Sequence, residues 1–236
     1  MSLILATHQP NYIPWLGYFY KLSQCDLFVF LDDVQFSKTG SHNYHYIKTP
    51  NGPLKLKIPV THGFTDPINQ VKTNDHNDWK KKHLQEIEKN YKTAPHFKEI
   101  YADFERILME DYNNLSDLNV AIILFIANKF GIDTQTAFSS DLNLDVKSED
   151  RIIQICKKLN ATTYYSGRGA KAYQSEENFN SNGLQLVYDA YAPAEYPQLW
   201  GEFQTNVCVL DYLMNCGYDW QSYKNRLEQN EQNSIR

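Results

Sequence analysis

A short polar and aromatic segment near the N-terminus holds the densest group of side chains that could do chemistry. Residues 7–15 read THQPNYIPW and directly follow an apolar stretch at residues 3–6. His8 could act as a general base, hold a phosphate when protonated or hydrogen-bond a substrate. The alternative is a structural histidine that ties the loop to backbone carbonyls. The further ligand-binding groups that this segment offers are Gln9, Asn11, Tyr12 and Trp15.

An acidic pair follows the second apolar stretch, residues 27–31. If both stretches are parallel strands, His8, Asp32 and Asp33 lie at the same edge of one sheet, where open α/β sheets bind ligands. Asp32 could then orient His8, or bind a ribose or an amine. Either acid could instead cap a turn. The sequence therefore favours His8 and Asp32 as the catalytic pair.

A turn of small residues with two cations follows a third predicted strand, at residues 162–166. Residues 166–171 read SGRGAK, and their backbone N–H groups could cradle a phosphate. A plain turn is the alternative, because neither a full P-loop nor a full dinucleotide fingerprint is present. This turn and the loop that carries His8 are expected to share the carboxyl edge of the sheet.

Other charged and thiol groups carry weaker signals. The basic helical turn at residues 79–83, WKKKH, is either a solvated face or a phosphate clamp, and Asp211 lies among apolar residues, where a buried carboxylate needs a partner. The histidines at 42, 45 and 62 lack the acidic or thiol neighbours of a metal site, so no metal and no cofactor are expected. The four cysteines form no C-x-x-C pair and are expected to be reduced and buried.

The composition is that of an ordinary globular protein, with 42% hydrophobic and 22% charged residues. The net charge of −5 argues against a general nucleic-acid binder. No apolar run reaches the roughly 20 residues of a membrane span, and no signal peptide is apparent, so a cytoplasmic location is expected. The 17 tyrosines suit a cleft as well as a core.

Hydrophobic periodicity predicts an α/β fold with a Rossmann-like parallel sheet, an added β-hairpin and a helical insertion. The hairpin is expected at 42–60, a short strand at 68–71, and the insertion at about 77–130. Within the insertion, helices are predicted at 79–91, from about 95 to 109, and at 118–130 with Ser116 as the cap. Residues 1–226 are expected to form a single domain, ending with a helix at 207–215, and residues 227–236 a polar, frayed tail.

The opening segment resembles the signature of the WbqC-like family. The resemblance rests on residues 8–19, HQPNYIPWLGYF, and 32–36, DDVQF, and further blocks agree along most of the chain. They include residues 58–60, 79–83, 165–167, 196–198 and 210–211. The chain departs from the family pattern in the hairpin, where Tyr44 and His45 stand near a usual arginine, which puts an anion-binding role there in doubt.

The resemblance implies a bacterial enzyme of surface-polysaccharide and nucleotide-sugar biosynthesis, with acyl or aminoacyl transfer to an amino-sugar nucleotide as the leading hypothesis. The implied partners are a nucleotide-sugar substrate and an acyl or aminoacyl donor on a carrier protein. The alternatives are a non-catalytic sugar-nucleotide binding protein and a nucleotidyltransferase-like enzyme. The residues expected to bind substrate are Gln9, Asn11, Tyr12, Trp15, Gln35, Lys48, Lys82, His83, Ser166, Gly167, Arg168, Tyr173, Tyr196 and Gln198.

The nucleotidyltransferase alternative comes from a more distant likeness in architecture. The start of the chain is similar to that of pantothenate synthetase, whose fold uses two paired histidines of H-x-G-H type. Here His8 has no second histidine nearby, and residues 15–18, WLGY, stand at the corresponding place. Adenylation is therefore not supported residue by residue, although the fold can be shared.

Overall fold

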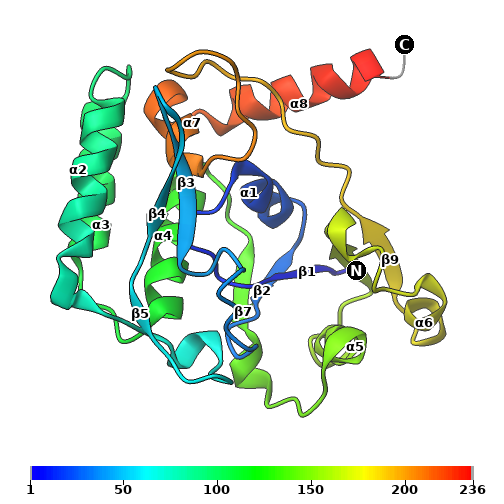
Figure 1. Ribbon diagram of the computed structural model, residues 1–236. Helices are drawn as coiled ribbons and strands as arrows, with labels where there is room; N and C mark the ends of the chain where they lie inside the picture. The colour runs from blue at the N-terminus through cyan, green and yellow to red at the C-terminus, as the bar shows by residue number, and fades with distance from the viewer. Residues whose placement is uncertain (1, 235–236) are drawn as a thin grey trace. The chain divides into compact units, whose positions relative to one another are not determined.

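The computed structural model describes residues 2–234, which divide into two compact units (Figure 1). Unit 1 comprises residues 2–9, Gly17–Val34 and Ile132–Tyr191. Unit 2 comprises Pro10–Leu16, Gln35–Gly131 and residues 192–234. The chain passes between the units several times, so neither is a continuous segment. The expected single domain over 1–226 stays a prediction.

Unit 1 is built on a five-stranded parallel sheet in the order β7-β2-β1-β8-β9. This confirms the predicted Rossmann-like parallel sheet. The first strand lies in the centre, and the chain adds strands on one side of it and later on the other. The strands are β1 (Ile4–His8), β2 (Leu27–Phe30), β7 (Gln135–Phe138), β8 (Thr163–Ser166) and β9 (Gln185–Tyr188).

Both faces of this sheet are buried, as alternation along each strand requires. On one face Leu5 and Val29 pack with α5 (Ser148–Lys158) and α6 (Glu176–Ser181). On the other face Phe28 meets Tyr18 of α1 (Leu16–Ser23), with ring centroids 5.5 Å apart. In Figure 1, α1 and α5 lie on opposite sides of the sheet. Because both faces of the sheet are covered, a ligand can reach it at the ends of the strands.

Unit 2 combines helices with two small antiparallel sheets. The predicted hairpin is confirmed as β3 (Tyr44–Thr49) and β4 (Gly52–Lys57), which form a sheet of their own. Strands β5 (Val60–Thr61) and β6 (Lys72–Thr73) pair with each other. The helices are α2 (Trp79–Tyr91), α3 (Phe97–Met109), α4 (Leu115–Lys129), α7 (Val209–Cys216) and α8 (Trp220–Ser234).

Two sequence-based predictions in unit 2 are wrong. The expected strand at 68–71 is a 3-10 turn at Ile68–Gln70. Helix α4 starts at Leu115, earlier than predicted, because Asn114 and not Ser116 caps it by accepting the N–H of Asp117. Residues 227–234 of the expected polar tail continue α8 as far as Ser234, and the tail as a separate part of the chain stays a prediction. Residues 235–236 of that tail lie outside the described part.

Candidate functional site

The strongest candidate site lies at the carboxyl ends of β1 and β8 in unit 1. These strands are neighbours, with Ala6 opposite Tyr165, and the order of the sheet reverses between them. Such a switch point is where open α/β sheets bind ligands, because loops leave adjacent strands in opposite directions. His8 ends β1 and Ser166 ends β8, so the predicted sharing of this edge by the two loops is confirmed.

His8 is half-buried and has a defined tautomer. Its Nδ1 lies 3.0 Å from the carbonyl oxygen of Gln9. A carbonyl only accepts, so Nδ1 donates its proton to this oxygen. The ring packs at 4.7 Å from that of Tyr18, whose hydroxyl donates to the same Gln9 carbonyl. This arrangement fixes the orientation that a general base needs.

Ser166 and Thr7 are tied to the sheet by buried side-chain hydrogen bonds. The Ser166 hydroxyl donates to Oε1 of Gln174 at 2.6 Å. The hydroxyls of Thr7 and Tyr164 lie 2.9 Å apart across β1 and β8. Arg168, which is exposed, uses its Nε to donate to the backbone oxygen of Asp189 at 2.7 Å. The turn after β8 is therefore pinned to the end of β9.

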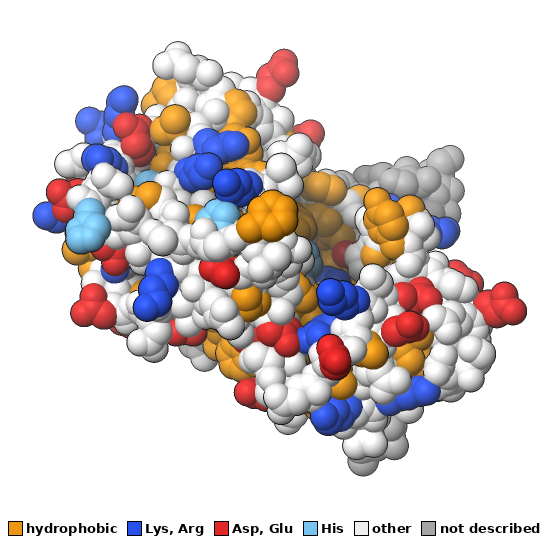
Figure 2. Space-filling model, turned by 60° about the horizontal axis from the view of Figure 1, so that its bottom comes forward, with side chains coloured by type: hydrophobic (Ala, Val, Ile, Leu, Met, Phe, Trp, Pro, Cys, Tyr) orange, Lys and Arg blue, Asp and Glu red, His pale blue; other side chains and the backbone are white. Residues whose placement is uncertain are grey.

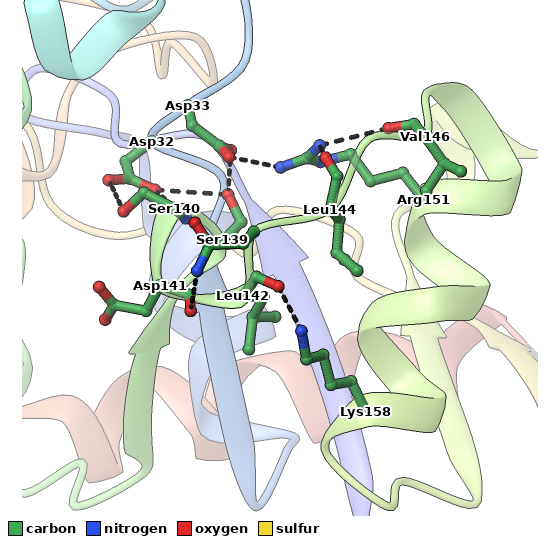
Figure 3. A network of polar contacts seen from close by, with 11 residues as sticks. Asp32, Asp33, Ser139, Ser140, Asp141, Leu142, Leu144, Val146, Arg151 and Lys158 are labelled. Atoms are coloured by element: carbon green, nitrogen blue, oxygen red, sulfur yellow. Dashed lines mark hydrogen bonds and ion pairs between the residues drawn. The ribbon is translucent and has the colours of Figure 1, made fainter.

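The acidic pair belongs to a polar network at the ends of β2 and β7 (Figure 3). Asp32 accepts from the Ser140 backbone N–H at 3.0 Å and from its hydroxyl at 2.7 Å. The Ser139 hydroxyl donates to Asp33 and, at 3.3 Å, to Asp32. Arg151 of α5 donates to Asp33 at 2.5 Å and also to the Leu144 and Val146 carbonyls. Both acids thus connect the end of β2 to other segments of unit 1: Asp32 to the residues after β7, and Asp33 to these residues and to α5.

A second polar cluster, centred on the buried side chains of Asp211 and Lys48, lies inside unit 2. Asp211 accepts hydrogen bonds from Tyr91 at 2.7 Å and from Tyr196 at 3.0 Å. Burial raises the pKa of the Asp211 carboxyl, and the two tyrosine hydroxyls oppose that rise. The Lys48 ammonium donates to the Glu202 carbonyl at 2.6 Å and to Oε1 of Gln198 at 2.9 Å. The hydrogen-bond partners expected for a buried Asp211 are therefore Tyr91 and Tyr196.

This second cluster occupies three of the residues expected to bind substrate. Lys48 has no exposed surface, and the ring of Tyr196 packs at 5.0 Å from that of Tyr212. The Gln198 amide donates to the Tyr196 hydroxyl and to the Gln204 carbonyl, both at 3.0 Å. In this structure the three side chains stabilise unit 2, and their contact with substrate stays a prediction.

The other predicted binding residues of unit 2 lie in different surroundings. Tyr12 and His83 come together, with the hydroxyl 2.9 Å from Nδ1, and both are buried. Trp15 borders a pocket of about 250 Å³ and stacks on His45 at 6.4 Å. Gln35 borders an open pocket of about 570 Å³. Asn11 is buried, whereas Lys82 and, in unit 1, Tyr173 are exposed.

The family follows from the sequence comparison. The model of the WbqC-like protein family matches residues 9–223. The chain belongs to the WbqC-like family. The match starts one residue after His8 and includes both the acidic pair and the turn after β8. This protein is also similar to Uncharacterized protein Rv1507c of Mycobacterium tuberculosis, with 36% identity over 225 residues, which is 93% of this chain and 96% of the relative.

The surface of this WbqC-like protein shows no field of one sign on the face in Figure 2, where basic and acidic side chains are interspersed. Within residues 2–234, no three histidine, cysteine or acidic side chains are grouped as a metal site would need. Across the same described residues, none of the helices has both the length and the hydropathy to cross a membrane.

Sequence reasoning missed one group at the switch point, Lys21. It lies on α1, is 7% exposed, and donates to the Thr7 carbonyl at 2.8 Å. Burial lowers its pKa to about 8, against the attraction of Asp189. A signal was present, because Lys21 is the one charged residue in the helical stretch LGYFYKLS. Only the helix packing shows that its ammonium reaches the end of β1.

Proposed function

We propose that this WbqC-like protein is a transferase of bacterial surface-glycan biosynthesis, which moves an acyl or aminoacyl group onto the amine of a nucleotide-linked amino sugar. The observation that supports the proposal is His8 at the switch point, with its ring oriented by the contact between Nδ1 and the Gln9 carbonyl. An imidazole that is half-buried and held in one orientation suits general acid–base chemistry.

In the proposed reaction the sugar amine attacks the acyl carbonyl of a carrier-bound donor. The new C–N bond forms as the bond between the acyl carbon and the carrier breaks. His8 takes the proton from the attacking nitrogen and returns it to the leaving group of the carrier. Asp32, fixed by Ser139 and Ser140, orients His8 or the amine.

The test is turnover with an acyl-carrier thioester and a panel of amino-sugar nucleotides, followed by mass spectrometry of the product. His8→Ala is expected to lower the rate at least 100-fold, the size of a lost general base. His76→Ala, which changes an exposed histidine of a 3-10 turn in unit 2, is the matched control and should keep the wild-type rate. A His8→Ala variant with full activity would remove His8 from the chemistry.

A non-catalytic sugar-nucleotide binding protein is the second candidate, and the network around the acidic pair favours it. Asp32 and Asp33 already accept hydrogen bonds from Ser139, Ser140 and Arg151, which gives them a structural task without any reaction. This candidate predicts a higher melting temperature with a nucleotide sugar and no product with any donor. A new acylated sugar in the mass spectrum excludes it.

A further inference from the structure

The ammonium of Lys21 is a buried cation without a counter-ion at the switch point. Its one hydrogen bond within residues 2–234 is the 2.8 Å contact with the Thr7 carbonyl, although an ammonium has three donors. No carboxylate of the described residues lies within 4.0 Å of it. Buried charges are normally paired, and the single printed hydrogen bond leaves donors of this ammonium for an anion.

The nearest acidic group is engaged elsewhere. Oδ1 of Asp189 accepts from the Tyr191 backbone N–H at 2.6 Å and from the Tyr165 hydroxyl at 3.2 Å. It attracts Lys21 only from a distance beyond an ion pair. The other ionisable neighbour, Cys25, is a thiol whose pKa is raised to about 12 by burial, so it carries no compensating charge at neutral pH.

The turn after β8 lies beside this ammonium. A methyl group added to Gly167 would lie 4.0 Å from the Lys21 nitrogen, so the glycine faces the ammonium with no side chain between them. The backbone N–H groups of Arg168 and Gly169 have no acceptor within residues 2–234. The exposed Arg168 guanidinium uses only its Nε, on the Asp189 carbonyl.

We infer that Lys21, facing Gly167 across the ends of β1 and β8, binds a phosphate group of the substrate. Donors on two sides suit the several oxygens of a phosphate better than they suit a neutral ligand. This inference deepens the proposed function, on which it rests for the nucleotide-sugar identity of the ligand. The sequence predicted a phosphate contact at the turn that carries Arg168, and Lys21 adds a second cation there. Lys21 lies on α1, the helix that follows the loop after His8.

The test is binding of inorganic pyrophosphate, UDP and uridine to the full chain, measured by calorimetry without any acyl donor. Wild type should bind pyrophosphate and UDP but not uridine, and Lys21→Met should weaken both affinities at least tenfold. Lys147→Met removes an exposed lysine of unit 1 and serves as the matched control, with affinities within twofold of wild type. The unfolding midpoint of each variant shows whether it is folded.

A second variant separates binding from folding. Gly167 has φ −70° and ψ 144°, a conformation that alanine adopts without strain, so Gly167→Ala keeps the fold and narrows the space beside Lys21. It should weaken pyrophosphate binding at least threefold. Wild-type affinity in both Lys21→Met and Gly167→Ala, or no binding of pyrophosphate and UDP by wild type, overturns the inference. Phosphate binding without acyl transfer would sustain it and count against the proposed reaction alone.

Discussion

The Tyr91 hydroxyl donates a 2.7 Å hydrogen bond to the Asp211 carboxylate, although the two residues lie 120 positions apart in the chain. The same hydroxyl accepts the backbone N–H of Lys48 at 2.9 Å. One phenol thus joins α2, α7 and strand β3. Since all three groups are buried, loss of any of them leaves polar atoms without partners, which costs more than the hydrogen bond itself.

Removal of the Asp211 carboxylate should destabilise the protein strongly. Asp211→Ala leaves Tyr91 and Tyr196 without their acceptor and the Lys48 ammonium without its nearby negative charge. We expect the free energy of unfolding in urea to fall by about 3 kcal/mol. Asp111→Ala, at an exposed acid of unit 2, should change it by less than about 0.5 kcal/mol. Equal values for the two variants would contradict a structural role of Asp211.

Lys48 should hold the segment around residues 198–204 in place. Its ammonium donates to groups of Gln198, Gly201 and Glu202, so Lys48→Met removes these three hydrogen bonds. Stability should fall by about 1–3 kcal/mol. Relative to wild type, the variant should show faster hydrogen exchange in residues 198–204 and an unchanged rate in the hairpin turn at residues 50–52. Lys55→Met, at an exposed hairpin lysine, is the control and should leave both segments unchanged.

Three buried histidines predict a loss of stability in mild acid. Burial lowers the pKa of His42, His45 and His83 to about 4. Their unfolded value is 6.5, so the unfolded chain takes up protons first, and stability falls as the pH drops from about 6.5 to 4. Urea unfolding at pH 7, 6, 5 and 4 measures the slope. His45→Asn keeps an acceptor for the Tyr46 N–H and should make the slope shallower; an unchanged slope would exclude His45.

The Asp33–Arg151 pair should contribute to stability rather than to the chemistry. The two side chains are 23% and 12% exposed, and the guanidinium also donates to two backbone carbonyls. Arg151→Met should lower the free energy of unfolding by about 2 kcal/mol. A double-mutant cycle with Asp33→Asn gives the coupling between the pair. In the transfer assay, both variants should keep their rate at temperatures where they remain folded, whereas a large loss of rate in folded Asp33→Asn would place Asp33 in the reaction.

Local patterns in the sequence correctly predicted several elements. Trp79, His83, Ile87 and Tyr91 are spaced by four residues, which places them on one face of a helix. The helix predicted from this spacing has the same first and last residues as α2. Asn114 and Ser116 are both suitable N-cap residues and lie two positions apart, so the sequence pattern favoured Ser116 although Asn114 caps α4.

The sequence by itself determined the parallel sheet, the hairpin and the family, because strand periodicity and the opening motif are local properties of the chain. Only the tertiary structure decided which polar groups meet. It paired Asp211 with Tyr91 and Tyr196, engaged Asp33 with Arg151, and brought Lys21 to the end of β1. The physical reason is that a buried charge needs partners, and those partners come from segments far apart in the chain, whose meeting no local period encodes.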